Sequence, residues 1–462
     1  YNTQRTELLP NQEDIKIEQT EEMVIDNVTS EKTDANTIEA LIEISNPQEK
    51  EIIDIEVEDM EVTITKNNTE AGKTYIEIKA TPTRFYDSYK VSKIIYKEKG
   101  EEKEQETSAR IEEQFYKELY SYEDWQGIEE GTYQNYKLMN DIDFAGRDNI
   151  KSNVTMSRLE SNGSTLKNIE ISLSGDYSGL IREIRTDLRG VNFENIIINA
   201  NSENYVGIIA KSTAKTENLN FSNITINAST SNTVGCIGII KDTNISNITA
   251  EEITITGKSY IGGIVGSCTD VKKISEIVAK SVIIDASDGE HVGGLTSRIS
   301  NNSSVELSNI IVQQSTISSK INVGGIFGYM STTSNSEGYI ILEDSTVSGD
   351  SQVGGIGGYL QNIVNNSSLA NIWVKNSNIF ATGNSVGGIA GHGGNISNSH
   401  VIDSNIICNN INSNNVGGII GLSYGNVRSG CSVENCKISS KGSRVGGLIG
   451  YLNNAWVRSK CR

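Results

Sequence analysis

The pattern of hydrophobic and polar positions divides the chain into two regions. In the first, short runs of Val, Ile, Thr and Tyr alternate with charged residues, which is typical of half-buried β-strands. The six predicted strands are Met23–Val28, Thr37–Ser45, Ile52–Asp59, Val62–Thr65, Thr74–Ala80 and Tyr89–Tyr96. So many strands within about 90 residues predict an acidic antiparallel β-sandwich over residues 21–106, in which each strand has one solvated face. Residues 1–20 are expected to be an N-terminal linker.

A different pattern follows between residues 107 and 131. Ile111, Phe115 and Leu119 recur every four residues, as on one face of a helix. Ser121 is a candidate N-cap for a further helical turn. We therefore predict a short helical plug over residues 107–131, between the sandwich and the region that follows.

Beyond residue 170 a six-residue pattern close to Val-Gly-Gly-Ile-x-Gly recurs ten times, with 27–33 residues between successive copies. Its first positions are Tyr177, Val206, Val234, Ile261, Val292, Val323, Val353, Val386, Val416 and Val445. A fixed period of this size indicates a solenoid. The intervening segments are rich in Ile, Val, Asn, Ser and Thr, and they lack both helical stretches and the frame of leucine-rich repeats.

One turn of a parallel β-helix uses about 30 residues for three short strands and three turns. All 3 prolines lie before residue 83, which fits because a proline within a coil would remove a ladder hydrogen bond. Paired glycines suit a sharp bend that is repeated on every coil. We therefore predict an all-β chain in which the sandwich is followed by a right-handed parallel β-helix of about ten coils over residues 132–462. Its core should be a stack of Ile, Val and Leu, with ladders of Asn, Ser and Thr at the turns.

Charge follows the same division. The chain has 462 residues and a net charge of −19, and its first 120 residues carry 15 Lys and Arg against 29 Asp and Glu. The acidic surplus is therefore mostly the solvated face of the sandwich. It argues against a nucleic-acid partner, which needs a basic surface. No apolar run approaches the roughly 20 residues that span a bilayer, so direct membrane insertion is not expected.

The repeat resembles the GLUG repeat of Gram-positive surface proteins. Tyr136–Phe144 looks like the opening of such β-helices, and Asn162–Ile169, Gly179–Ile184 and Leu188–Phe193 are similar to the rungs that follow it. Their order is similar to the N-terminal, non-catalytic region of zinc metallopeptidases of the immunoglobulin A protease type. The resemblance covers about residues 85–462 and implies an extracellular protein, either secreted or associated with the cell wall.

The zinc site of that family is an HExxH helix with a downstream glutamate, and this sequence has no such motif. Its histidines are His291, His392 and His400, and none is paired at the spacing that places two ligands on one helical face. No catalytic residue can be carried over from the family. We therefore expect no catalytic site, no metal and no cofactor in this chain.

The candidate binding residues fall six positions after the first residue of successive repeats. These positions hold Tyr329, Tyr359, His392, Leu422 and Tyr451, and coils stacked about 4.8 Å apart would align them in a column. Tyr329, Tyr359, His392 and Tyr451 would form an amphipathic platform for a glycan or a peptide if they face outward. The alternative is a structural stack that stabilises the coils. The sequence leaves open which way the column faces.

Other candidate sites are weaker. Asn140, Asp141 and Asp143 offer oxygen ligands for calcium, but side chains along one strand do not converge. Carboxylates in the repeat region fall at different positions of the repeat, which is typical of scattered surface charge and not of a catalytic cluster. Cys431 and Cys461 are 30 residues apart and would stack on adjacent coils, either as a disulfide or as two thiols.

These observations predict an extracellular, non-catalytic structural and binding region that displays or recruits a macromolecular substrate, a host glycoprotein or a glycan. It would be the front section of a metallopeptidase-like surface protein. One alternative is a cell-surface adhesin or a mucin-binding stalk, and another is a polysaccharide-cleaving β-helix enzyme, which would need converging carboxylates. Residues 452–462 begin another coil, so a downstream domain or a second chain is expected to cap the C-terminal coil.

Overall fold

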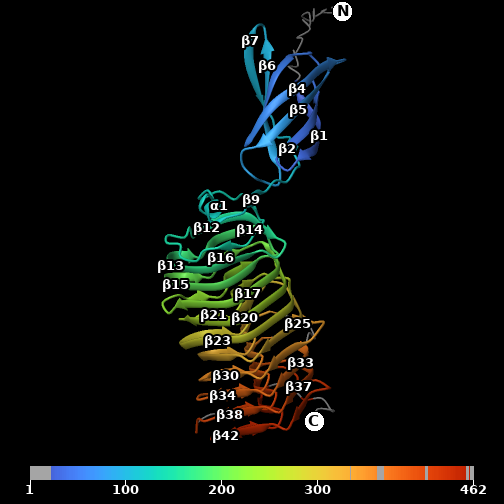
Figure 1. Cartoon of the computed structure of the whole chain (residues 1–462). Coiled ribbons are helices and arrows are strands. Elements are labelled where there is room, and N and C mark those ends of the chain that lie inside the picture. The colour runs from blue at the N-terminus through green and yellow to red at the C-terminus, as the bar shows by residue number, and fades with distance from the viewer. Residues whose placement is uncertain (1–21, 333, 362–368, 412–414, 454–456, 458–462) are drawn as a thin grey trace, which may run out of the picture. The chain divides into compact units, whose positions relative to one another are not determined.

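The chain folds into two compact units, Tyr1–Phe115 and Tyr116–Arg462 (Figure 1). The structure is a computed structural model, and it describes residues 22–332, 334–361, 369–411, 415–453 and 457. The two units have separate hydrophobic cores that share no residue. The division falls within the stretch 107–131 that the sequence pattern assigned to a linker, and the expected N-terminal linker lies outside the described residues.

The first unit consists of two antiparallel sheets, as predicted. One sheet has the order β1 (Val24–Asp34), β2 (Thr37–Ser45), β5 (Lys73–Pro82) and β4 (Met60–Glu70). The other has the order β3 (Glu51–Val57), β6 (Tyr89–Glu98) and β7 (Glu101–Glu106), and β8 (Arg110–Ile111) also pairs with β6. Alternation in β2 shows how the core forms, since Ile38, Ile42 and Ile44 are fully buried while Glu39 is exposed.

The predicted helix across Ile111, Phe115 and Leu119 is wrong. Ile111 ends β8, Leu119 ends β9 (Lys117–Leu119), and Phe115 lies in a segment without regular structure. All three side chains are buried, but in different cores. Ile111 and Phe115 pack in the first unit and Leu119 packs in the second. The four-residue spacing therefore reflects burial on both sides of a domain boundary and not one face of a helix.

A single turn of helix, α1 (Tyr122–Gln126), follows β9 at the N-terminal end of the second unit. Ser121 caps it as predicted, because its side chain accepts a hydrogen bond from the Asp124 N–H and the Asp124 carboxylate accepts one from the Ser121 N–H. Trp125 is fully buried, and its Nε1–H donates to the carbonyl of Lys151 at 2.9 Å. Its ring meets Phe144 edge-on at 5.9 Å, so α1 closes this end of the core.

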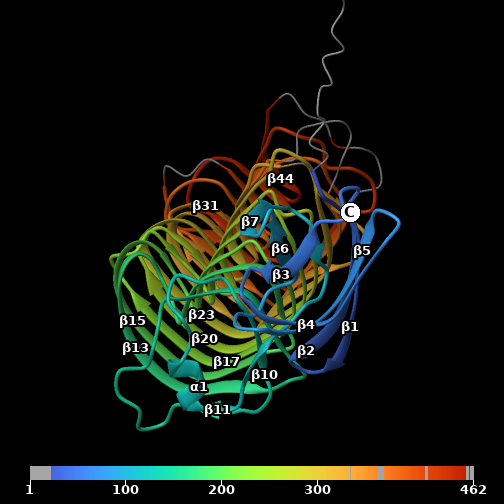
Figure 2. The same cartoon turned by 90° about the horizontal axis from the view of Figure 1, so that it is seen from above.

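The second unit is a parallel β-solenoid of about ten turns, which confirms the predicted architecture. Figure 2 shows its longest strands side by side in one sheet. After β9, the first strands are β10 (Asn135–Leu138), β11 (Ile142–Asp143), β12 (Val154–Ser161), β13 (Thr165–Ser178), β14 (Ile181–Arg189), β15 (Asn192–Val206), β16 (Ile209–Ser212), β17 (Lys215–Ala228), β18 (Thr233–Val234), β19 (Ile237–Lys241), β20 (Asn244–Gly257), β21 (Tyr260–Gly262), β22 (Val265–Thr269), β23 (Lys273–Gly293) and β24 (Thr296–Ser300).

The later coils contain shorter strands. These are β25 (Val305–Gln313), β26 (Thr316–Gly324), β27 (Phe327–Met330), β28 (Ser334–Ser336), β29 (Ile340–Glu343), β30 (Thr346–Gly349), β31 (Ser351–Gly354), β32 (Gly357–Leu360), β33 (Leu369–Lys375), β34 (Asn378–Ala381), β35 (Val386–Gly387), β36 (Ala390–Gly393), β37 (Ile396–Ile402), β38 (Asn405–Cys408), β39 (Val416–Gly417), β40 (Ile420–Ser423), β41 (Ser432–Glu434), β42 (Lys437–Ser440), β43 (Val445–Gly446) and β44 (Ile449–Leu452).

The repeat sets the register between coils. Val292 pairs with Val323, Val323 with Val353, Val353 with Val386 and Val386 with Val416, and all five side chains are fully buried. The glycines of successive copies pair in the same way. Equivalent repeat positions therefore lie directly above one another, and the apolar residues form one continuous stacked core.

The first copy of the repeat begins one residue later than the sequence suggested. Ser178, not Tyr177, pairs with Val206, and Tyr177 pairs with Tyr205. The paired residues of the two strands are 28 apart here, one fewer than the 29 that separate Tyr177 from Val206. Tyr177 therefore occupies the position before the repeat and not its first position.

The predicted polar ladders are present at the turns. Asn195 donates to Asn168 at 3.1 Å and Asn223 donates to Asn195 at 2.7 Å, and all three adopt positive φ angles, which asparagine tolerates. A second ladder is buried. In it the Ser345 N–H donates to the Ser377 hydroxyl at 3.2 Å, and the Ser377 N–H donates to the next hydroxyl, that of Ser404, at 3.1 Å.

In the described residues, no helix is long and apolar enough to cross a membrane.

Candidate functional site

Each Val-Gly-Gly copy forms a sharp corner between two strands. At Gly324 an added Cβ would lie 2.0 Å from the carbonyl oxygen of Phe327, and at Gly328 it would lie 2.5 Å from the backbone nitrogen of Val292. Backbone therefore packs against backbone here, and glycine is required. Val323 and Phe327 on the two arms are fully buried. Two positions flank the corner: the residue just before the repeat, and the residue six positions after its first residue.

The structure brings three of the four predicted binding residues together. Tyr329 pairs with Tyr359 and Tyr359 pairs with His392, and their ring centroids are 5.0 Å and 4.4 Å apart. Leu422 follows His392 in register, and Tyr451 follows Leu422. Tyr451 therefore lies in the same column, but Leu422 separates its ring from that of His392.

The column faces outward, which the sequence left open. Tyr329 and Tyr359 are half-buried, whereas Phe327 and Met330 on either side of Tyr329 are fully buried in the core. His392 is 9% exposed and Tyr451 is 37% exposed. The rings lie partly sunk in the surface, with part of each tyrosine accessible to a ligand.

Three further rings extend this column, and the sequence analysis missed them. Ring centroids are 5.2 Å apart for Tyr260 and His291, 4.8 Å for His291 and Tyr329, and 4.8 Å for His392 and Tyr424. The resulting aromatic column is made of Tyr260, His291, Tyr329, Tyr359, His392 and Tyr424. Tyr260 and His291 directly precede their repeat copies, so their signal was present in the sequence at that flanking position, whereas Tyr424 occupies neither flanking position.

Amide side chains orient both histidines of the column. The Asn322 Nδ2–H group donates to His291 Nδ1 at 2.8 Å, and the Gln352 Nε2–H group donates to His392 Nδ1 at 3.5 Å. Asn322 and His291 both occupy the position before the repeat on adjacent coils, whereas the bond from Gln352 to His392 links the two flanking positions. Each histidine is therefore held as a neutral ring whose Nε2 carries the proton.

The column is nearly uncharged at neutral pH. Burial lowers the pKa of His392 to about 4. Burial also lowers the pKa of His291 to about 4, and the positive charge of Arg298 adds to this effect. The flanking positions from Tyr260 to Leu422 contain one charged side chain, that of Arg298, and no carboxylate. We call these twelve positions the corner strip: Tyr260, Ser267, His291, Arg298, Asn322, Tyr329, Gln352, Tyr359, Ser385, His392, Asn415 and Leu422.

Charged residues at the same positions in the early coils are paired with one another. Glu183 accepts hydrogen bonds from Lys211 at 2.8 Å, from Arg185 at 3.3 Å and from the Tyr133 hydroxyl. Burial alone would raise the pKa of Glu183, but these hydrogen bonds outweigh it and lower the pKa to about 2. This carboxylate is therefore ionised and fully engaged, which is a structural role and does not suit a general acid.

The remaining candidate residues take structural places. Asp143 accepts from Asn168 at 2.8 Å and Asp141 accepts from the Thr165 N–H at 2.9 Å, so both extend the turn ladders. His400 stacks on Trp373 at 5.7 Å, away from the corner strip. Among the described residues, no three His, Cys, Asp or Glu side chains are grouped to hold a metal ion. The predicted partner of Cys431, Cys461, lies outside the described residues.

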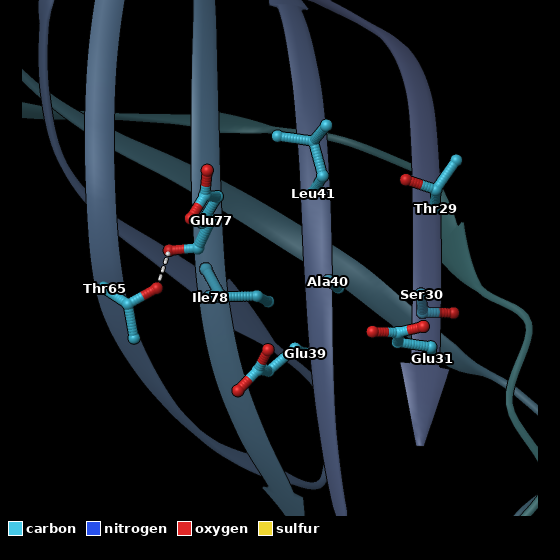
Figure 3. Close-up of a pocket in the computed structure, with 9 residues that line it drawn as sticks. All are labelled: Thr29, Ser30, Glu31, Glu39, Ala40, Leu41, Thr65, Glu77 and Ile78. Atoms are coloured by element: carbon cyan, nitrogen blue, oxygen red, sulfur yellow. Dashed lines mark hydrogen bonds between the residues drawn. The ribbon is translucent and has the colours of Figure 1, made fainter. Parts of the chain in front are cut away.

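The first unit carries an open hollow of about 480 Å³ on the outer face of its four-stranded sheet (Figure 3). Glu31, Glu39 and Glu77 line it, and all three are exposed. The Thr65 hydroxyl donates to the backbone carbonyl of Glu77 at 3.0 Å. The hollow is the predicted solvated acidic face of the sandwich, and we assign no site to it.

Comparisons with known proteins add little to these observations. No family model and no curated protein matches the sequence. A solved structure from Bacteroides ovatus, which carries the provisional description immunoglobulin A1 protease, is similar over 73% of this chain and 83% of its own. Its sequence identity is 15% and its TM-score is 0.25, and at these values the likeness carries no argument about function.

Proposed function

We propose that this chain is an extracellular, non-catalytic binding region that recruits a macromolecular ligand, a glycoprotein or a glycan, along the corner strip. The aromatic column carries the proposal. Six rings in unbroken contact cross successive coils, with spacings of 4.4–5.2 Å, on an outward-facing surface. Half-buried aromatic side chains combine an apolar face with little conformational freedom, which suits recognition of an extended polymer.

The resemblance to GLUG-repeat surface proteins supports the same role. Within it, the chain would be the front section of a metallopeptidase of the immunoglobulin A protease type, holding substrate near a catalytic domain elsewhere. An adhesin would use the same surface to hold a cell to its ligand. A polysaccharide-cleaving enzyme is the weaker alternative, because the corner strip contains no carboxylate to act as acid, base or nucleophile.

The test is binding of the purified chain to a glycan array and to immobilised mucin. Replacing Tyr329 and Tyr359 by Ala should weaken binding by about ten-fold or more, because each aromatic contact contributes roughly 0.5–1.5 kcal/mol beyond its buried area. Tyr339→Ala is the matched control, since Tyr339 is 40% exposed and lies outside the column. A lower melting temperature with unchanged binding would instead show that the column only stabilises the coils.

A further inference from the structure

The corner strip contains buried polar atoms without a hydrogen-bond partner, and these indicate the kind of ligand that it fits. They are Nε of Arg298, Oδ1 of Asn322, Nε2 of His392 and Oδ1 of Asn415. The last three side chains are only 7%, 9% and 8% exposed. These atoms lie below the surface, so they mark the strip as polar between its rings and do not contact a ligand directly. A ligand that suits the strip combines polar groups with apolar faces.

Arg298 is the one charged residue of the strip, and no carboxylate pairs with it. It precedes Tyr329 in the column, and its guanidinium carbon lies 5.8 Å from the centre of that ring. Its side chain makes one long hydrogen bond, 3.4 Å from Nη2 to the hydroxyl of Ser300. The terminal Nη groups of the guanidinium therefore keep donors for a ligand at one end of the run Tyr329, Tyr359 and His392.

We propose that the corner strip binds a carboxylated glycan, with its carboxylate on Arg298 and its sugar rings along Tyr329 and Tyr359. This inference rests on the proposed function and adds the class of ligand. A carboxylate matches the planar fork of a guanidinium. The apolar faces of sugar rings pack on aromatic side chains.

The single charge of the strip narrows this class of glycan. The strip offers one cation, so it matches isolated carboxylates on an otherwise uncharged sugar chain better than a densely charged polyanion. The ligand is therefore a glycan with few acidic groups, such as one that contains sialic or uronic acid residues.

An extended peptide fits this surface less well. Peptides commonly bind by adding a strand to a free sheet edge. Here the backbone is already paired from coil to coil, with the Gly325 N–H donating to the Gly355 carbonyl at 2.9 Å and the Gly355 N–H donating to the Gly388 carbonyl at 3.1 Å. Recognition at the corner must therefore come from side chains, which favours the glycan.

Titration calorimetry of the whole chain at neutral pH tests the proposal. The probes are sialyllactose against lactose, and a hyaluronan hexasaccharide against chitohexaose. We expect at least one carboxylated probe to bind about ten-fold more tightly than its uncharged counterpart, because charge-assisted hydrogen bonds are the strong ones. Arg298→Gln should remove that preference. Lys320→Gln is the matched control, since it removes the same charge from an exposed position outside the strip.

The outcomes separate this inference from the proposed function. If uncharged and carboxylated probes bind equally, and Arg298→Gln changes the binding of neither, the role of Arg298 is overturned. In that case, loss of binding in the Tyr329→Ala, Tyr359→Ala variant would still support the proposed function of the aromatic column. Tighter binding of a glutamate-rich peptide would overturn the glycan class. If neither carboxylated probe binds at millimolar concentration, the inference is wrong. If the tyrosine variant binds every probe like the parent chain, the proposed function itself fails.

Discussion

His291 and His392 lie between rings of the aromatic column, where water is largely excluded. Each accepts a hydrogen bond from a neighbouring amide, which suits the neutral ring. Protonation would place a positive charge among aromatic side chains that already hold little water. At the scale of single residues, the column therefore contains two histidines that stay uncharged at neutral pH, and the stability of the fold should depend on pH as a result.

Stability should fall as the pH is lowered from about 6.5 to about 4. In this window the unfolded histidines take up protons, while the folded ones, with pKa values of about 4, do not. The free energy of unfolding therefore decreases through the window, and the contribution of these two residues levels off below pH 4. Urea unfolding at several pH values measures the slope.

The double variant His291→Gln, His392→Gln should show a shallower slope, because glutamine cannot titrate. His400→Gln is the matched control, since it removes a histidine outside the column. An unchanged slope in the double variant would show that these rings are not shielded from protonation.

Single residues also show the limit of sequence reasoning. The repeat spacing alone aligns Tyr329, Tyr359 and His392. Tyr260 and His291 lie seven positions earlier in their repeats, so the residues of this one column fall at two different repeat positions in the sequence. The two join only because the arms of each corner fold back beside each other. That contact is tertiary, and no periodicity reports it.

At the scale of elements, the corner is the unit that repeats. Paired glycines let the two strands of a corner approach until backbone atoms touch, and this close approach is what brings the flanking positions together. The sequence predicted the corners from the glycines alone. It failed where the pattern crossed a boundary, because Ile111 and Leu119 have helical spacing but belong to different cores.

Replacing the second glycine of a corner should destabilise the solenoid. At Gly325 an added Cβ would lie 2.2 Å from the Gly355 carbonyl oxygen and 2.7 Å from the Leu342 side chain. Gly325→Ala should cost about 1–3 kcal/mol or more, as overpacking does. Gly447→Ala is the control at the same repeat position, because nothing lies within 4 Å of a Cβ there. Equal melting temperatures for the two variants would contradict this account.

At the scale of the whole molecule, the fold class of the solenoid could be predicted because it depends on repetition. Ten copies of one pattern average out local exceptions, such as the shifted register at Tyr177. The boundary between the two units could be placed only approximately from the sequence, since it depends on which of the two cores each side chain enters. The outward direction of the aromatic column likewise could not be predicted, because Tyr329 is half-buried while Phe327 and Met330 on either side of it are both buried, which simple alternation does not reveal.

The modular character of the solenoid leads to a final prediction. Tyr329 pairs with Tyr359 and Met330 pairs with Leu360, so each pair occupies equivalent positions on adjacent coils. Deleting residues 330–359 removes one whole coil of 30 residues and joins Tyr329 to Leu360 without changing the register. Because each coil contacts only its neighbours, the shortened chain should still fold cooperatively.

Deleting only residues 330–344 removes half a coil and is the matched control. It would bring polar turn residues into line with the buried positions of the next coil, so that chain should aggregate or unfold at room temperature. Circular dichroism and thermal unfolding of the two deletions measure the difference. Because the whole-coil deletion also removes one ring of the column, it should bind mucin more weakly than the parent chain while retaining its fold. If both deletions unfolded alike, the coils would not be independent modules, and the column could not be shortened without losing the structure that holds it.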